Sequence, residues 1–163
     1  MIRTAIITLS DKGSKGERED ESGKIIREMI TSIGASVRSY EILPDELSLI
    51  VNALERLSDS GELDLIITTG GTGVSPRDVT PEATRKVIDR DLPGMAEAMR
   101  AESLKKTPHA MISRAIAGIR KQTLIINLPG SPKAVRENLF VVLPALSHAI
   151  EKIKGDPAEC GSL

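Results

Sequence analysis

Short apolar runs alternate along this chain with segments of helical periodicity, and this alternation limits the fold more than any other feature. Compact runs rich in Ile, Leu and Thr cover residues 4–9, 63–69 and 123–128, each with the length of a buried strand. A weaker alternating pattern over 35–43 predicts a further, more exposed strand. Strands separated by helices pair in parallel within one sheet. The sequence therefore predicts an α/β fold with a doubly wound, mostly parallel sheet and helices on both faces.

Helical segments fill the intervals between these runs. Apolar residues at helical spacing predict helices over 25–33, 46–57, 80 onward, 95–104, 111–119 and 135–153. Pro144 lies within the last of these and is expected to kink that helix or split it in two. Residues 12–21 are typical of a polar surface loop, which either closes over a ligand or is simply solvated. No linker or internal repeat is recognised, so residues 1–155 are expected to form one domain and residues 156–163 a C-terminal tail.

Composition argues against several classes of function. Lys and Arg number 22 against 23 Asp and Glu, so no overall field attracts nucleic acid or a membrane surface. The only aromatic residues are Tyr40 and Phe140, which removes the stacking platforms that RNA readers use. The single cysteine, Cys160, has no partner for a disulfide or metal site. With no apolar stretch of membrane-spanning length, we expect a cytoplasmic protein that binds neither nucleic acid nor membrane.

A glycine-rich loop follows the apolar run over 63–69. Gly70, Gly71 and Gly73 surround Thr72, and Thr80 with the following proline marks a helix start. Glycines let backbone N–H groups turn toward an anion, so this order of strand, loop and helix is typical of a phosphate site. An ordinary tight turn is the alternative. The loop lacks the Gly-Lys-Ser/Thr ending of a P-loop and the third glycine of a dinucleotide-binding fingerprint.

Four polar groups follow the ends of predicted strands. They are Ser10-Asp11, Asp45, the loop from Gly70 to Asp78, and the segment from Asn127 to Ser131. In an open parallel sheet these ends share one edge, where ligands bind. Each group also has a structural alternative: Asp45 as a helix cap, Asp78 in a surface ion pair with Arg77 or Arg85, and Asn127 bonded to backbone groups of the turn. Their joint placement favours a ligand site.

Other catalytic constellations have little support. His109 and His148 lie far apart in the sequence, without Cys or carboxylate at ligand spacing, which disfavours a zinc site. Ser75 and Ser131 lack a Gly-x-Ser-x-Gly setting and a histidine partner, which disfavours acyl transfer.

Five motif strings together resemble the molybdopterin adenylyltransferase family of the Mog type, which is similar to the G domain of gephyrin. The strings are Thr69-Gly70-Gly71-Thr72-Gly73, Pro76-Arg77-Asp78-Val79-Thr80-Pro81-Glu82-Ala83-Thr84, Ser113-Arg114, Ala117-Gly118-Ile119-Arg120 and Asn127-Leu128-Pro129-Gly130-Ser131-Pro132. The resemblance extends from Ser10 to His148. It implies transfer of AMP from Mg-ATP to the terminal phosphate of molybdopterin with release of pyrophosphate. It further implies a homotrimer, with a molybdenum insertase as downstream partner.

The resemblance also implies roles for particular residues. Asp45 and Asp78 match the family's functional aspartates, and we assign them to Mg²⁺ binding and phosphate positioning. Thr72 and its neighbouring glycines match the loop that holds molybdopterin. The remaining substrate-binding positions implied are Ser10, Asp11, Ser103, Ser113, Asn127, Pro129, Gly130 and Ser131. Ser103 and Ser113 lie in predicted helices, where an exposed or backbone-bonded serine is the alternative.

Two other functions within the family need to be weighed. A non-catalytic molybdopterin-binding or scaffold protein would need the glycine loop but not both Asp45 and Asp78, so the presence of both favours the enzyme. A molybdate-insertase domain has a related loop but normally belongs to a longer, multidomain chain.

Overall fold

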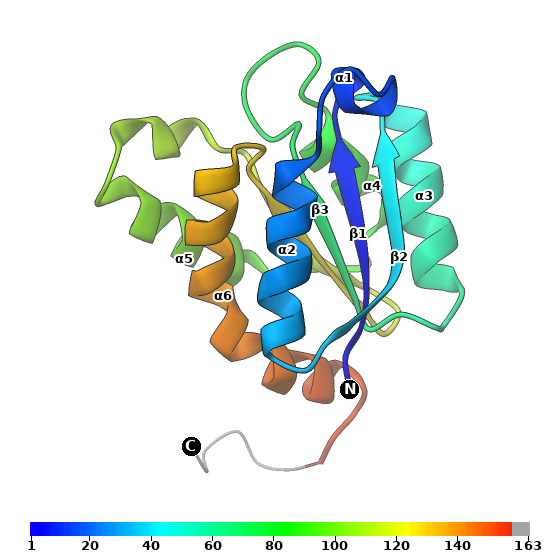
Figure 1. The fold of residues 1–163 in the computed structure, drawn as a ribbon. Coiled ribbons are helices and arrows are strands. Elements are labelled where there is room, and N and C mark those ends of the chain that lie inside the picture. The colour runs from blue at the N-terminus through cyan, green and yellow to red at the C-terminus, as the bar shows by residue number, and fades with distance from the viewer. Residues whose placement is uncertain (158–163) are drawn as a thin grey trace.

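A six-stranded sheet with the order β2-β1-β3-β6-β5-β4 forms the centre of the computed structural model, which describes residues 1–157 (Figure 1). The strands are β1 (Arg3–Leu9), β2 (Ser36–Leu43), β3 (Leu65–Thr69), β4 (Arg90–Asp91), β5 (Ala117–Arg120) and β6 (Thr123–Leu128). β1 pairs in parallel with β2 and β3, and β3 in parallel with β6. β5 is antiparallel to both β6 and β4. The expected mostly parallel sheet is confirmed.

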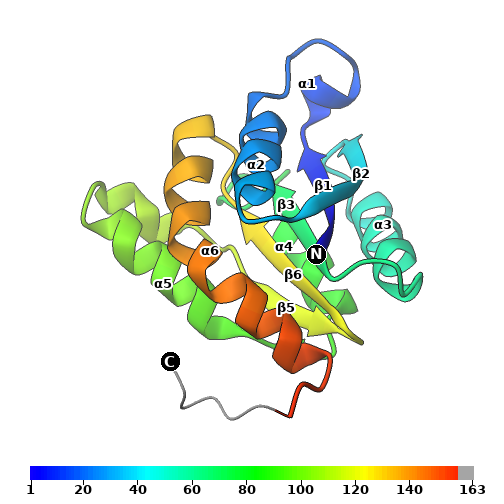
Figure 2. The same cartoon turned by 60° about the horizontal axis from the view of Figure 1, so that its bottom comes forward.

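Helices cover both faces of this sheet. They are α1 (Asp11–Ser14), α2 (Glu21–Ser32), α3 (Leu47–Asp59), α4 (Thr80–Val87), α5 (Pro93–Leu104), the short 3₁₀ helix η1 (Pro108–Ile112) and α6 (Pro132–Ile153). Figures 1 and 2 show α2, α5 and α6 on one face and α3 and α4 on the other. The β1–β2 connection through α2 and the β2–β3 connection through α3 run in opposite directions across the sheet, so right-handed crossovers place these two helices on opposite faces.

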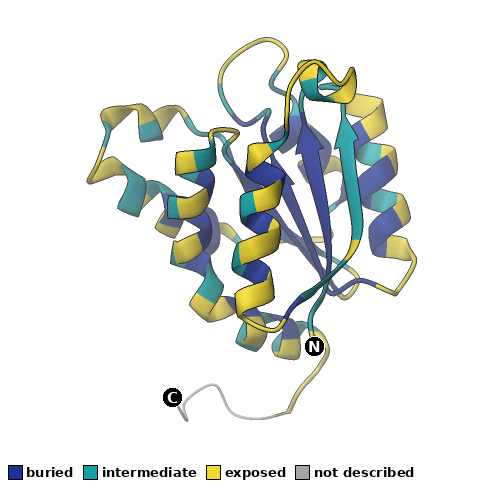
Figure 3. Ribbon diagram, in the orientation of Figure 1, coloured by how far each residue is buried: buried dark blue, intermediate teal, exposed yellow. Residues whose placement is uncertain are grey.

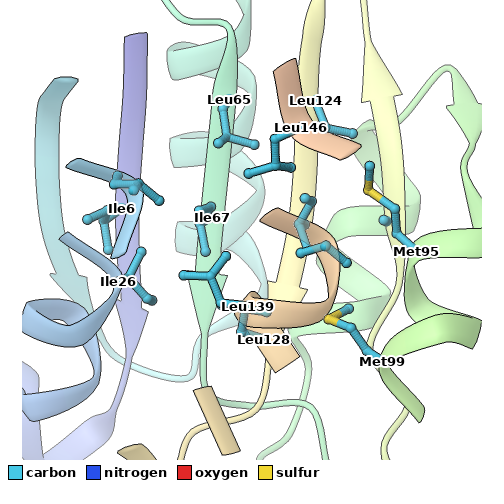
Figure 4. Close-up of a cluster of buried hydrophobic side chains, with 14 of the residues drawn as sticks. Ile6, Ile26, Leu65, Ile67, Met95, Met99, Leu124, Leu128, Leu139 and Leu146 are labelled. Atoms are coloured by element: carbon cyan, nitrogen blue, oxygen red, sulfur yellow. The ribbon is translucent and has the colours of Figure 1, made fainter. Parts of the chain in front are cut away.

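Two apolar cores result, one on each face. Ile6 and Ile67 point from the sheet toward α2, α5 and α6, where they meet residues such as Ile26 and Leu139 (Figure 4). The alternate strand residues, among them Ile7, pack on the opposite face against α3 and α4. Successive strand residues face opposite sides, so strands covered on both faces are apolar at nearly every position. Figure 3 shows the central strands buried and the edge strand β2 only partly buried.

The helix predicted over 111–119 is wrong. The structure has η1 over residues 108–112 and the strand β5 over 117–120. β5 is a strand because it pairs with β6 and β4, which apolar spacing alone cannot reveal. Gly118 makes this packing possible, since a Cβ there would lie 2.7 Å from the Ile88 side chain and 2.9 Å from the Arg90 carbonyl oxygen. The two-residue strand β4 was not predicted either.

Two further differences concern local helical structure. α6 continues through Pro144 without being split. Because proline has no N–H, Pro144 leaves the Phe140 carbonyl without its helical hydrogen bond. Both residues are exposed, so water can donate to that carbonyl. Within the expected loop, residues up to Ser14 form the single turn of α1, because the Ser10 hydroxyl caps it by accepting from the Gly13 N–H.

The C-terminal part of the predicted tail, including Cys160, lies outside the described residues. Within residues 1–157, none of the helices is long and apolar enough to span a bilayer.

Candidate functional site

Two cavities open at the edge of the sheet where the parallel strands end. The larger, cavity A, has a volume of about 600 Å³ and lies over the ends of β1 and β3. Its lining comprises Thr8, Leu9, Ser10, Asp11, Lys12, Gly13, Arg18, Glu19, Asp20, Glu21, Ser22, Asp45, Thr69, Gly70, Gly71, Asp78, Gly130, Ser131 and Pro132. Most of these residues come from the segments that follow β1, β2, β3 and β6.

Cavity B, of about 450 Å³, lies between the glycine loop, α5, η1 and the start of α6. Its lining comprises Gly71, Thr72, Gly73, Asp78, Ala96, Met99, Arg100, Ser103, Thr107, His109, Ala110, Ile112, Ser113, Ala115, Pro129, Gly130, Ser131, Ala134, Glu137 and Asn138. Gly71, Asp78, Gly130 and Ser131 line both cavities. The two cavities therefore meet between the glycine loop and the N-terminus of α6.

The first two glycines of the loop adopt conformations that favour glycine. Gly70 has φ 95° and Gly71 has φ 64°. A Cβ on Gly70 would lie 2.4 Å from the Leu9 carbonyl oxygen, and one on Gly71 would lie 2.4 Å from Thr80 Oγ1. Thr80 donates from Oγ1 to the Gly70 carbonyl (2.9 Å) and from its N–H to the Gly71 carbonyl (3.1 Å). The start of the loop is thus bound tightly to the start of α4.

Asp45 and Asp11 hold each other at the mouth of cavity A. The Asp45 N–H donates to Asp11 Oδ1 (3.0 Å), and the Asp11 N–H donates to Asp45 Oδ2 (3.2 Å). Burial raises the pKa of Asp45, and the negative charges of Asp11 and Asp78 raise it further. Hydrogen bonds from Arg77 and from the Asp45 backbone hold the pKa of Asp11 below its ordinary value. Asp45 is therefore a partly buried carboxylate next to two further negative charges, a setting that favours a bound cation.

Asp45 and Asp78 do not take the purely structural roles, helix cap and surface ion pair, that the sequence offered as alternatives. α3 has no side-chain cap, so Asp45 does not serve as one. Arg77 donates to both carboxylate oxygens of Asp11, at 3.1 and 2.8 Å, and to Glu46 (3.1 Å). The Asp78 carboxylate instead accepts a hydrogen bond from the Ser75 N–H (2.9 Å). It remains at the junction of the two cavities.

Every predicted site residue except Asn127 lines one or both cavities. Asn127 is fully buried, and its Nδ2 donates to the Thr68 hydroxyl (3.0 Å) and the Thr84 hydroxyl (2.9 Å). Its Oδ1 accepts from the Ile116 N–H (3.3 Å). The structure therefore gives Asn127 internal partners that join β6 to β3 and α4.

The predicted serines occupy three kinds of position. Ser10 and Ser131 cap α1 and α6, and each hydroxyl accepts a backbone hydrogen bond. Ser131 also places the positive end of the α6 dipole at the junction of the cavities. Ser103 lies in α5 as expected, whereas Ser113 follows η1 in extended conformation, so its predicted helical position is wrong.

Several polar or charged lining residues were not predicted as site residues. Lys12 and Arg18 line cavity A, and Arg100 and His109 line cavity B. Lys12 and Arg18 belong to the segment expected as a surface loop. The position of this segment after β1 was the only sequence feature that could have marked them as site residues. Asp20 anchors that segment because its carboxylate accepts hydrogen bonds from the Thr8 hydroxyl (2.5 Å) and the Tyr40 hydroxyl. Burial, together with Asp20, raises the pKa of Tyr40 to about 12.

Among the described residues, no cluster of three or more His, Cys, Asp or Glu side chains is arranged to hold a metal ion by itself. A cation at cavity A would therefore take only one or two carboxylates from the protein. This is the usual arrangement for Mg²⁺, which keeps several waters and binds substrate phosphates.

Comparison with known proteins identifies the family to which this chain is similar. Residues 5–148 match the family described as "Probable molybdopterin binding domain". The chain is 46% identical over 157 residues to a molybdopterin adenylyltransferase of Helicobacter pylori, covering 95% of this chain and 89% of that protein. It is 42% identical over 151 residues to the molybdopterin adenylyltransferase of Escherichia coli K12, covering 91% of this chain and 77% of that protein. Its fold is similar to the crystal structure of the molybdopterin biosynthesis enzyme MoaB from Thermus thermophilus, with a TM-score of 0.90, 51% identity and coverage of 98% and 100%.

Proposed function

The chain belongs to the family of probable molybdopterin binding domains, and from this membership and the paired cavities we infer that it is a molybdopterin adenylyltransferase. The reaction transfers AMP from ATP to the terminal phosphate of molybdopterin. An oxygen of that phosphate bonds to the α-phosphorus of ATP, the bond from the α-phosphorus to the bridging oxygen breaks, and pyrophosphate leaves. The observation that carries this proposal is that two substrate-sized cavities meet at Gly71 and Asp78.

Charge and polarity favour a particular assignment of the substrates. Cavity A is lined by Lys12 and Arg18, which suit a triphosphate, and by the carboxylates of Asp45 and Asp78, which suit its metal ion. Cavity B combines apolar side chains such as Ala96, Met99 and Ile112, which suit the faces of a pterin ring, with polar side chains from α5, η1 and α6, which suit its ring nitrogens. We therefore assign ATP to cavity A and molybdopterin to cavity B, with the reacting phosphates at the junction.

The residues of cavity A fit Mg²⁺. Burial of Asp45 and the neighbouring charges of Asp11 and Asp78 raise the pKa of Asp45, and a divalent cation there would offset both effects. Asp45 and Asp78 would hold the ion. When bound, it would neutralise charge on the triphosphate and on the departing pyrophosphate.

The protein's main task in this mechanism is to bring two anions together. The nucleophile is a phosphate monoester with a second pKa near 6. It is largely dianionic at neutral pH and needs no general base. Gly71 and Gly73 let the loop backbone approach this phosphate closely, and the positive end of the α6 dipole at Ser131 favours negative charge there. Positioning and electrostatic stabilisation then supply the rate enhancement.

Pyrophosphate release from ATP in the presence of molybdopterin tests the proposal. Asp78→Asn is expected to lower kcat by about 100-fold, because a metal-binding charge is lost where the phosphates meet. Asp59→Asn makes the same chemical change in an ion pair with Arg120 and Lys121, outside both cavities, and should leave kcat unaltered. Full activity of Asp78→Asn would overturn the assignment. Binding of molybdopterin by the wild type without pyrophosphate release would instead identify a binding or scaffold protein.

We further propose the assembly and cellular context that the family resemblance implies. The chain forms a homotrimer in the cytoplasm and passes its adenylylated product to a molybdenum insertase. A reducing compartment protects the dithiolene sulfurs of molybdopterin. Light scattering measures the oligomeric state directly.

A further inference from the structure

Arg114 binds the glycine loop at several points. It lies in the extended segment between η1 and β5, and its N–H donates to the Thr72 carbonyl (2.8 Å). Its side-chain Nε donates to the Gly73 carbonyl (2.6 Å) and its Nη2 donates to the Asp78 carbonyl (2.7 Å). The remaining nitrogen, Nη1, forms an ion pair with Glu82 in the first turn of α4. One guanidinium group therefore joins two points of the loop that are five residues apart.

The loop between these two points is anchored elsewhere chiefly by Arg77, whose side chain pairs with Asp11 and Glu46. Residues 74–77 are exposed, and Val74 is 65% exposed. The Asp78 carboxylate is held close to Gly73, since a Cβ on that glycine would lie 2.9 Å from Asp78 Oδ2. Gly70 and Gly71, in contrast, are held independently by Thr80. Arg114 therefore acts on the position of Gly73 and Asp78 more than on the start of the loop.

We propose that Arg114 is a positioning residue for adenylyl transfer, which sets the distance between Gly73 in cavity B and the Asp78 carboxylate at the junction of the two cavities. This inference rests on the proposed function, because that distance matters only if both cavities hold reacting substrates. The planar guanidinium donates from two nitrogens in a fixed geometry. A lysine keeps the charge but cannot hold two carbonyls at a fixed separation.

Steady-state kinetics of Arg114→Lys test this role, with Glu82→Gln as the matched control. Glu82→Gln removes the ion pair but leaves both carbonyl contacts intact. Arg114→Lys is expected to lower kcat by at least about tenfold and to raise the Mg²⁺ concentration for half-maximal rate, with the KM for molybdopterin changed by less than about threefold. Glu82→Gln should retain wild-type values. A kcat for Arg114→Lys within about twofold of the wild type would overturn the proposal.

Hydrogen exchange of the loop amides provides a readout that does not depend on activity. Arg114→Lys is expected to exchange faster over residues 74–78, with residues 70 and 71 unchanged, and Glu82→Gln should match the wild type. Unchanged exchange in folded Arg114→Lys would overturn the role of Arg114. If the wild type releases no pyrophosphate, the proposed function fails, while the exchange data still decide whether Arg114 holds the loop.

Discussion

Replacement of Asp64 by asparagine is expected to lower the free energy of unfolding by about 2–3 kcal/mol. Asp64 lies just before β3, at the end of the sheet opposite the cavities, and its side chain is 1% exposed. Its carboxylate accepts hydrogen bonds from the Arg3 N–H (2.8 Å), from Arg3 Nε (3.2 Å) and Nη2 (2.7 Å), and it pairs with Lys154 Nζ (2.7 Å). It thereby joins the starts of β1 and β3 to the end of α6.

The size of this loss of stability follows from the hydrogen bonds that asparagine cannot make in place of Asp64. Each hydrogen bond to a charged group contributes about 1.5–3 kcal/mol, and asparagine retains one acceptor oxygen while turning an NH₂ group toward the other donors. The side chains of Arg3 and Lys154 are 38% and 42% exposed, so they can turn to water. The change therefore costs less than the roughly 3–5 kcal/mol of stranding a charge in the interior.

The effect should depend on pH in a defined direction. Burial alone would raise the pKa of Asp64, but the hydrogen bonds from Arg3 and Lys154 outweigh it and hold the pKa well below its ordinary value. A lowered folded-state pKa contributes stability that is fully present above the unfolded pKa of about 3.9 and is lost as pH falls toward the folded value. The difference between wild type and Asp64→Asn should therefore be constant near neutral pH and shrink below about pH 4.

Urea unfolding followed by far-UV circular dichroism measures this difference, since the chain has no Trp and a single Tyr. Wild type, Asp64→Asn and Asp59→Asn are compared at equal protein concentration, because any oligomer makes stability depend on concentration. Asp59 carries the same charge but is 36% exposed, so its replacement should cost much less. A loss below about 1 kcal/mol for Asp64→Asn, or a difference that grows in acid, would refute the reasoning.

Two further substitutions examine one residue of the cavity lining and one buried residue outside it. Gly71→Ala should lower the free energy of unfolding by about 2 kcal/mol and reduce pyrophosphate release. The alanine would be strained at φ 64°, and its Cβ would displace the Thr80 side chain. Gly94→Ala in α5, where a Cβ meets nothing, serves as control and should be neutral or stabilising in the same urea titration. Asn127→Ala should lower the free energy of unfolding by about 2–3 kcal/mol and leave the KM for molybdopterin unchanged. Asn52→Ala, at an exposed position, is its control and should change the free energy of unfolding little. Loss of molybdopterin binding by a stable Asn127→Ala protein would show instead that this residue contacts substrate.

Features that depend on neighbours in the sequence were predictable from the sequence alone. The apolar runs predicted β1, β3 and β6 because a strand covered on both faces must be apolar throughout. The glycine loop and the polar residues after each strand predicted the edge at which both cavities open. The joint motif strings were specific enough to indicate the family.

Features that depend on contacts between distant segments needed the tertiary structure. The apolar residues near Ile119 fit a helix or a strand equally well, and pairing with β6 decided for the strand. The sequence placed Asn127 at the correct edge, but the direction of its side chain depends on Thr68 and Thr84. The double contact of Arg114 joins residues more than 30 positions away, so no local pattern could predict it. Local periodicity and glycine content thus determined where the site lies, while packing between remote segments determined which side chains reach it and how the two cavities meet.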